Sequence, residues 1–226
     1  DGIEGYDRLI LSNERSASEG NAHHDGREVN HQYSKSIAFE ERLADILATL
    51  TGGALGYFSL LRPYSEARIT RLFARTTRFD DVFSSCNRNF RYNGHDGSLW
   101  CGECPKCHFV FLMLAPVVSR ERLLGIFGKD LLANPANEMS FRELTGLAGQ
   151  KPWECVGEIL EAAAALWELT SKPEWRDTPI VTSLKPDLLK QYGEARLKSA
   201  LADLLRDSPQ HHVPADIAER VAAHAS

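Results

Sequence analysis

The sequence predicts an α/β protein in which a parallel sheet near the start of the chain is followed by a mainly helical part. Residues 6–12 and 56–61 are short apolar runs typical of buried strands, and a helical pattern covers residues 34–50 between them. Because a helix of this length can carry the chain across a sheet, we expect both strands to lie parallel in one sheet. The apolar spacing in the remainder is mostly helical. These observations predict an α/β region over residues 1–128 and a helical region over residues 129–226.

Local signals indicate where individual helices begin and end. Gly52 and Gly53 are expected to end the helix over residues 34–50, and Ser65 is suited to cap a helix over residues 66–75. Further helices are predicted over residues 109–118, 120–127, 141–147, 186–206 and 214–224.

Composition narrows the functional classes. The 226 residues are 43% hydrophobic and 25% charged, which is typical of a globular protein with a sizeable core. A formal net charge of −5 argues against a broad nucleic-acid-binding surface. No apolar run approaches the length of a membrane span, and no basic segment followed by an apolar stretch opens the chain. We therefore expect no nucleic-acid partner, no membrane insertion and a cytoplasmic location.

Four of the five cysteines form a pattern typical of a metal site. Cys101, Cys104 and Cys107 make two overlapping C-x-x-C steps, and Cys86 lies fifteen positions upstream. Thiolates prefer zinc, and four of them complete a tetrahedral site with no open position for water. The pattern therefore predicts a structural zinc ion, and such a site suits a reducing compartment. Disulfides or unpaired thiols are the alternatives.

A polar loop follows the first predicted strand. Ligands bind at the carboxyl ends of strands in open α/β sheets, so residues 12–21 are a candidate ligand site. Within this loop, Glu14, Arg15, Ser16 and Asn21 are the candidate binding residues. The planar guanidinium of Arg15 suits a carboxylate or a phosphate. An ordinary polar loop is the alternative interpretation.

A second group of candidates follows the other strand and a later loop. Arg62 follows the second strand, where it could meet an anionic ligand or belong to a solvated basic face. Pro152 suits the first turn of a helix, which would place Cys155 near a helix amino terminus. The helix dipole and Lys151 would both favour a thiolate there. Glu154 and Glu158 are the other titratable groups of this junction, whereas a buried apolar thiol is the alternative for Cys155.

Several of these motifs together resemble known proteins. The pattern from Cys86 to Trp-Cys-Gly-x-Cys-x-x-Cys, with an apolar helix behind it, is similar to the zinc segment of the cyano-deazaguanine synthases of the PP-loop ATP pyrophosphatase superfamily. The runs at residues 11–21, 57–66 and 151–158 resemble one family more closely, the bacterial UDP-N-acetylmuramoyl-L-alanyl-L-glutamate epimerases. They include Leu-Ser-Asn-Glu-Arg-Ser-Ala, Tyr-Phe-Ser-Leu-Leu-Arg-Pro and Lys-Pro-Trp-Glu-Cys-Val-Gly-Glu.

The resemblance implies a fold, an activity and cofactors. The fold would be part of a PP-loop-type (adenine nucleotide alpha-hydrolase-like) domain with a four-cysteine zinc loop. The implied enzyme uses ATP and Mg²⁺ to activate the terminal L-glutamate of a nucleotide-sugar dipeptide, inverts its α-carbon, and releases AMP and pyrophosphate. Cys155 would act as the base, and Glu154 or Glu158 would serve the opposite face or hold magnesium. The binding residues would be Glu14, Arg15, Ser16, Asn21, Arg62 and Lys151.

The sequence also departs from the superfamily pattern. Its Ser-Gly-Gly-x-Asp-Ser phosphate loop is absent from residues 1–226, so we expect a preceding amino-terminal part to carry it. Two other functions remain open. One is a PP-loop enzyme with a different product, such as a nitrile or amide synthase. The other is a non-catalytic module stapled by zinc.

Overall fold

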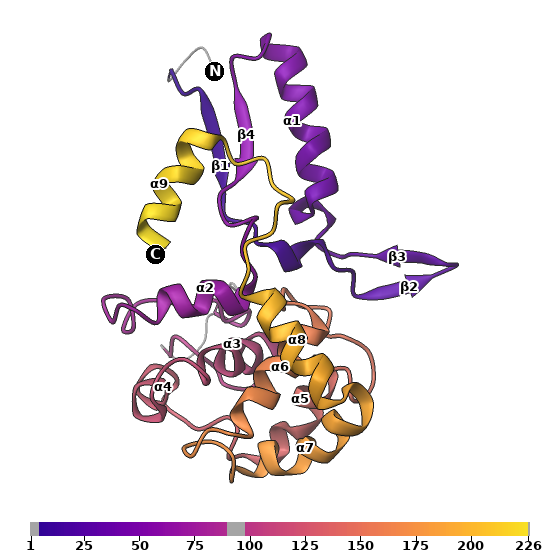
Figure 1. Ribbon diagram of the computed structural model, residues 1–226, viewed down its shortest axis with the longest axis vertical. Helices are drawn as coiled ribbons and strands as arrows, with labels where there is room; N and C mark the ends of the chain where they lie inside the picture. Colours follow the sequence, from indigo (N-terminus) through magenta and orange to yellow (C-terminus); the bar gives the residue numbers. More distant parts are fainter. Residues whose placement is uncertain (1–4, 90–97, 226) are drawn as a thin grey trace.

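The computed structural model describes residues 5–89 and 98–225. Figure 1 shows two regions, an elongated one that contains a sheet and a rounded one built from helices. The strands and one long helix occupy the upper part of the view, and a narrow hairpin projects between the two regions. The protein is thus an α/β protein with a small sheet and a largely helical remainder.

A two-stranded parallel sheet forms the centre of the first region. β1 (Arg8–Leu11) pairs with β4 (Gly56–Ser59) in a register that runs from Arg8 opposite Gly56 to Leu11 opposite Ser59. The crossover between them contains α1 (Ile37–Thr51), which packs on β4. The predicted parallel pairing of these two strands is confirmed.

The ends of α1 follow local capping rules. The Ser36 side chain accepts a hydrogen bond of 3.3 Å from the Phe39 amide, which satisfies a free N–H of the first turn. At the other end, Gly52 adopts a left-handed conformation with φ of 61°, which glycine tolerates without a steric penalty. The predicted end of this helix is confirmed.

A β-hairpin between β1 and α1 was not predicted. β2 (Ala22–His24) pairs antiparallel with β3 (Arg27–Val29), and Asp25 and Gly26 form the turn with φ of 48° and 72°. Two positive φ values in succession are typical of a tight hairpin turn, and Asp-Gly is a favoured sequence for it. The Asp25–Gly26 dipeptide was therefore the feature of the sequence that indicated this hairpin.

The second region contains most of the helices and the main hydrophobic core. Most of α6 (Ile159–Leu169) is buried, and it packs against α3 (Pro105–Leu114), α7 (Pro179–Tyr192) and α8 (Glu194–Leu204). The core includes the fully buried aromatic side chains Trp100, Phe111 and Trp175. The helices after α1 are α2 (Glu66–Phe73), α3 (Pro105–Leu114), α4 (Arg120–Phe127), α5 (Glu138–Leu144), α6 (Ile159–Leu169), α7 (Pro179–Tyr192), α8 (Glu194–Leu204) and α9 (Ala215–Ala225). Short 3₁₀ helices are η1 (Arg15–Ser18), η2 (Tyr33–Lys35) and η3 (Pro135–Asn137).

The start of α6 differs from the sequence prediction. The predicted helix start at Pro152 is wrong, because residues 151–158 are irregular and α6 begins at Ile159. A tertiary contact holds this segment in another conformation, since the Asn21 side chain donates a hydrogen bond of 2.8 Å to the Pro152 carbonyl. Gly157, which lowers helix propensity, lies between Pro152 and the true start.

Two further helices begin earlier than the sequence predicts. α3 starts at Pro105 because the Cys104 side chain caps it by accepting from the Cys107 amide. α7 starts at Pro179 and continues through Pro186, where one main-chain donor is lost inside the helix. Packing of buried α7 side chains such as Leu184 and Leu188 offsets that loss.

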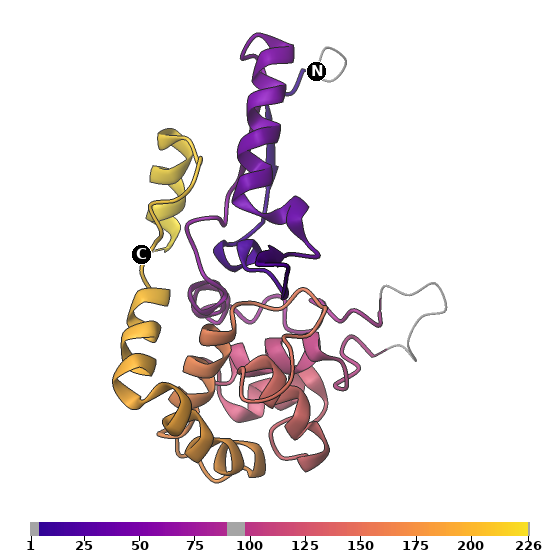
Figure 2. The same cartoon turned by 90° about the vertical axis from the view of Figure 1, so that its right-hand side faces the viewer.

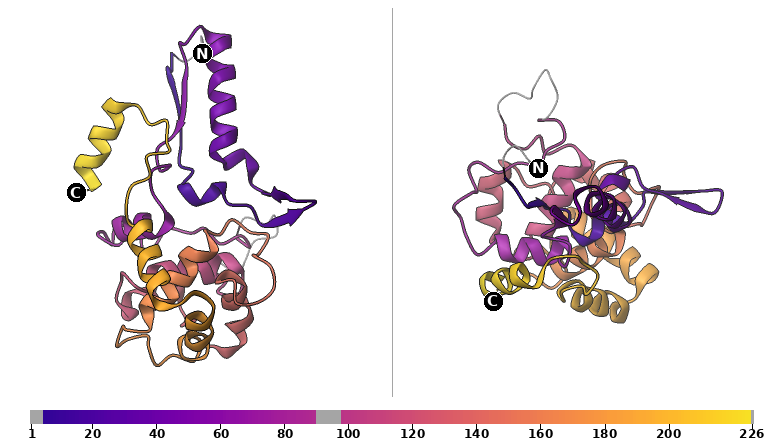
Figure 3. Two further views of the ribbon diagram at one scale, coloured as in Figure 1. Left: turned by 45° about the vertical axis from the view of Figure 1, so that its right-hand side comes forward. Right: turned by 90° about the horizontal axis from the view of Figure 1, so that it is seen from above.

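The cysteine segment belongs to the helical region. α3 packs against both α5 and α6, so the cysteine segment shares the core of the helical region. The division at residues 128 and 129 stays a prediction. α9 lies beside the sheet (Figures 2 and 3), and Asp216 forms a 3.0 Å ion pair with Arg8 of β1. Across the described part of the chain, no helix has both the length and the apolar character that a membrane span requires.

Candidate functional site

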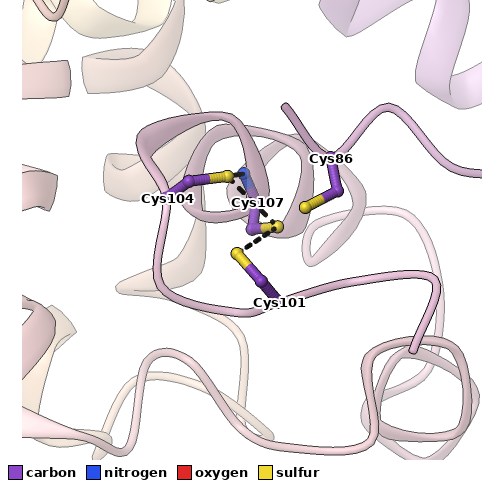
Figure 4. Close-up of side chains that lie close together, drawn as sticks. All are labelled: Cys86, Cys101, Cys104 and Cys107. Atoms are coloured by element: carbon purple, nitrogen blue, oxygen red, sulfur yellow. Dashed lines mark hydrogen bonds between the residues drawn. The ribbon is translucent and has the colours of Figure 1, made fainter. Parts of the chain in front are cut away.

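The side chains of the four clustered cysteines converge at the start of α3 (Figure 4). Their sulfur atoms all lie within 4.8 Å of one another, and all four side chains are buried. The Cys107 sulfur lies 3.5 Å from that of Cys104 and 3.7 Å from that of Cys101. Four thiolates at a Zn–S distance of about 2.3 Å would lie about 3.8 Å apart in a tetrahedron. The donor set and its spacing therefore fit a tetrahedral metal ion.

The local structure already favours one thiolate in this cluster. The hydrogen bond with the Cys107 thiol lowers the pKa of Cys104 to about 4, and the same contact raises the pKa of Cys107. A metal ion would replace the shared proton, because metal ligands must be deprotonated.

Glu154 connects the cysteine cluster to the irregular segment 151–158. Its carboxylate accepts hydrogen bonds from the Asn87 side chain (2.9 Å) and from the Lys106 amide (3.0 Å). Asn87 follows Cys86, and Lys106 lies in the first turn of α3. Partial burial raises the pKa of the Glu154 carboxyl group. These contacts fix the segment 151–158 against the cysteine cluster.

A charged pocket lies where the end of β1, the hairpin and the start of α6 meet. Its volume is about 370 Å³, and it is lined by Arg15, Ser18, Glu19, Glu28, Ile37, Arg62, Glu158 and Gln210. Arg15 faces Glu158, with 3.9 Å between the Arg15 Nε and a carboxylate oxygen. Burial raises the pKa of the Glu158 carboxyl group, and the positive charge of Arg15 opposes this shift. The structure therefore brings Arg15 and Glu158 together, as candidates from two distant loops.

Lys151 and Asn21 hold the segment 151–158 at this pocket. The Lys151 ammonium donates a hydrogen bond of 3.0 Å to Glu19, and its side chain is 3% exposed. The same Glu19 oxygen accepts from the Ile159 amide at the start of α6 (3.3 Å). The Asn21 side chain is buried between the Pro152 carbonyl and the His31 ring. Lys151 thus pairs with Glu19 of the pocket wall, and Asn21 fixes the segment that leads to Glu158.

Ser16, Glu14 and Arg62 lie close behind the pocket. The buried Ser16 hydroxyl donates to the Glu14 carboxylate (3.2 Å), and Arg62 donates to the Glu14 carbonyl (2.7 Å). Arg62 is 1% exposed and forms an ion pair with Glu40 at 2.9 Å. Its guanidinium is therefore occupied by protein groups, although its side chain contributes to the pocket wall.

Cys155 has a charged partner that the sequence did not reveal. The Lys35 ammonium donates a hydrogen bond of 3.3 Å to the Cys155 sulfur. Cys155 lies four residues before α6, so the expected position at a helix amino terminus is wrong. The positive charge next to the thiol comes from Lys35 of η2. No spacing rule predicts a contact between residues 120 positions apart.

Two carboxyl groups near the candidates were also missed. Glu161 is 1% exposed, and burial followed by the charge of Glu66 raises its pKa to about 8. Burial likewise raises the pKa of Glu66, whose carboxylate lies 3.9 Å from the Lys106 ammonium. The available signal was an acidic residue inside the otherwise apolar run from Ile159 to Leu166.

Together, these features define an α/β protein with a four-cysteine candidate metal centre and a charged pocket between its sheet and its helices. Two family models match the sequence: the MurL N-terminal domain matches residues 2–60, and the MurL C-terminal domain matches residues 82–199. The second match alone covers more than half of the chain. The chain therefore belongs to the MurL epimerase family.

Curated relatives agree with the family models. A protein from a Micromonospora species is 44% identical over 95% of this chain and 47% of its own length. A Salinispora tropica protein is 48% identical over 80% of this chain and 40% of its own, and one from Xanthomonas oryzae pv. oryzae is 41% identical over 98% and 49%. All three are named UDP-N-acetyl-alpha-D-muramoyl-L-alanyl-L-glutamate epimerase. The chain spans about half the length of these relatives, and no solved structure matches it.

Proposed function

We propose that this chain belongs to an ATP-dependent epimerase that converts the terminal L-glutamate of UDP-MurNAc-L-Ala-L-Glu into D-glutamate in peptidoglycan precursor synthesis. The observation that carries the proposal is the 41–48% identity to relatives of that name across most of the chain. The charged pocket supports it, because Arg15 and Glu158 face each other there at 3.9 Å. The reaction takes place in the cytoplasm.

Activation explains why ATP is needed. A glutamate α-proton next to a carboxylate is a very weak acid, because its removal would place two negative charges side by side. Transfer of AMP to the carboxylate, with release of pyrophosphate, leaves an acyl adenylate in which only one negative charge develops. A base on one face can then remove the proton, and an acid on the other face can return one.

The chain supplies candidates for both steps. Cys155 is the proposed base, and the Lys35 ammonium donates a hydrogen bond of 3.3 Å to its sulfur. Glu158, which faces Arg15 in the charged pocket, is one candidate for the residue on the opposite face. Glu154 is the other candidate for the opposite face or for holding Mg²⁺.

The remaining candidates bind or surround the substrate. Arg15 suits a carboxylate or phosphate oxygen of the substrate, and Lys151 holds Glu19 of the pocket wall through a 3.0 Å ion pair. Glu14, Ser16, Asn21 and Arg62 shape the loop that carries Arg15.

We also propose a structural zinc ion and a PP-loop-type fold. Cys86, Cys101, Cys104 and Cys107 would hold the zinc, which stabilises the loop without taking part in the reaction. The β1–β4 pair, joined through α1, is compatible with the parallel sheet of a PP-loop-type domain.

One assay tests the proposed function. The full-length protein is incubated with ATP, Mg²⁺ and UDP-MurNAc-L-Ala-L-Glu, and the hydrolysed product is analysed for glutamate chirality. We expect D-glutamate together with equal amounts of AMP and pyrophosphate. Release of AMP with an amide or nitrile product in the presence of ammonia would instead assign a PP-loop synthase. Absence of any ATP-dependent change in the dipeptide would contradict both enzymes.

A further inference from the structure

Glu161 and Glu66 form a pair of carboxyl groups at the contact between α6 and α2. Glu161 lies in the first turn of α6, and one of its oxygens accepts a hydrogen bond of 2.8 Å from the Ala67 amide of α2. Glu66 is the residue before Ala67, and its side chain remains 22% exposed. Glu161 is therefore buried in the core, while Glu66 is partly exposed.

The other Glu161 oxygen has no hydrogen-bond partner within the described residues. It lies against Gly157, where a Cβ atom would approach it to 2.5 Å and would meet the Phe109 ring at 2.6 Å. An unpaired buried carboxylate oxygen costs far more than an unpaired neutral one. The Glu161 side chain thus contacts both the Ala67 amide, next to Glu66, and Gly157 in the segment that carries Cys155 and Glu158.

Contacts link both carboxyl groups to the segment 151–158, because Glu66 lies 3.9 Å from Lys106, whose amide donates to Glu154, and Glu161 lies against Gly157. The charges of Lys106, Glu14 and Lys35 act on Glu66, and the charges of Glu66, Glu158 and Glu14 act on Glu161. Lys35 is also the hydrogen-bond donor to Cys155.

We propose that Glu66 is a further acid–base residue of this site and that Glu161 is a positioning residue that holds Glu66 and the Gly157 segment in place. The inference rests on the proposed epimerase function, which it deepens. In the protonated form, Glu66 gives its proton to the α-carbon of the activated glutamate, a C–H bond forms from the enolate electron pair, and a Glu66 carboxylate remains. The Lys106 ammonium is placed to balance that charge.

Glu161 performs this role as the neutral acid. At pH 7 its raised pKa of about 8 keeps it protonated, so that it adds no negative charge behind Glu66. As the pH rises through about 8, Glu161 ionises and repels both Glu66 and Glu158. We therefore expect an alkaline limb in the proton-exchange step that depends on Glu161.

The test measures deuterium uptake at the glutamate α-carbon in deuterium oxide, with the full-length protein, ATP, Mg²⁺ and UDP-MurNAc-L-Ala-L-Glu. AMP formation is recorded separately as the activation step. Glu66→Gln should slow deuterium uptake at least 100-fold while AMP formation changes less than threefold. Glu161→Gln should exchange at least tenfold faster than Glu161→Leu at pH 7, and its alkaline limb should move up by at least one pH unit. Glu168→Gln is the matched control, because Glu168 also joins α6 to α2, through a 2.8 Å ion pair with Arg71.

The outcomes separate the two proposals. If the unaltered protein takes up no deuterium, the proposed epimerase function fails. If the unaltered protein takes up deuterium and the exchange rate of Glu66→Gln is within threefold of it, Glu66 is not an acid–base residue. If Glu161→Gln keeps the alkaline limb of the unaltered protein, or if Glu168→Gln moves that limb equally, Glu161 is no positioning residue. The Gln variants retain the shape of the side chain, so these outcomes stand even where the Leu variant does not fold.

Discussion

The guanidinium of Arg62 lies 2.9 Å from the Glu40 carboxylate, and both side chains are 1% exposed. Arg62 also donates to the carbonyl groups of Glu14 and Lys35, each at 2.7 Å. The second Glu40 oxygen accepts from the Ser59 amide at the end of β4. One buried ion pair thus fixes the loops that carry both Arg15 and Lys35 relative to the sheet.

Removing one partner of this pair should destabilise the protein strongly. Glu40→Gln leaves the Arg62 charge buried without a counter-charge, which costs about 3–5 kcal/mol in comparable sites. We expect a matching decrease in the free energy of unfolding in urea. Glu194→Gln, which removes an exposed partner of Lys198, is the control and should leave the transition in place. Equal midpoints for both variants would contradict the structural role of the buried pair.

The four-cysteine cluster should carry one zinc ion per chain. Cys101→Ser should lower the bound zinc below about half an equivalent and reduce the thermal stability, because structural zinc contributes directly to folding. Metal analysis of freshly purified protein measures the content. Cys155→Ser is the control, since Cys155 lies outside the cluster and should retain the full equivalent. A metal content that is equal in both variants would assign the cysteines a different role.

Cys155 and Lys35 should act on proton exchange and not on activation. Cys155→Ser is expected to lower deuterium uptake at the glutamate α-carbon at least 100-fold while AMP formation continues. Lys35→Met should slow deuterium uptake while AMP formation continues, because the Cys155 sulfur loses its hydrogen-bond donor. Lys198→Met on the exposed face of α8 is the control. Persistent exchange in the Ser variant would leave Cys155 as a packing residue.

Glu161 should make the folded state less stable as the pH rises. Its pKa is raised from 4.5 to about 8 on folding, so the unfolded state releases this proton first. The contribution of the group to stability is therefore fully present below pH 4.5 and falls between about pH 4.5 and 8, at about 1.4 kcal/mol per pH unit. Glu161→Gln cannot ionise, so its stability relative to the unaltered protein should increase across that range.

Urea unfolding at pH 5, 6, 7 and 8 measures this difference. Glu168→Gln provides the matched comparison, because Glu168 is a paired carboxylate on the same helix and should show no such trend. A stability difference for Glu161→Gln that is constant from pH 5 to 8 would mean that Glu161 ionises normally in the folded protein.

Features with local causes were predictable from the sequence. Ser65 caps α2 through a local contact, because its hydroxyl accepts a hydrogen bond from the amide of Arg68, three residues further along the chain. Gly52 ends α1 through its own left-handed backbone conformation, which depends on no distant residue. The cysteine cluster was equally visible, because three of its ligands lie within seven residues and the C-x-x-C spacing aims their sulfurs at one point.

The sequence by itself therefore determined the parallel strand pair, most helices and the candidate metal ligands, all of which depend on periodicity, capping or short spacing. Only the tertiary structure decided the chemistry around them. Asn21 holds the carbonyl of Pro152 from 131 positions away and keeps residues 151–158 out of a helix, and Lys35 reaches Cys155 across 120 positions. The proton on Glu161 has the same origin, because its pKa depends on burial among α2, α3 and α6. The charge and burial of a site depend on contacts between segments that are distant in sequence, and no local sequence pattern predicts those contacts.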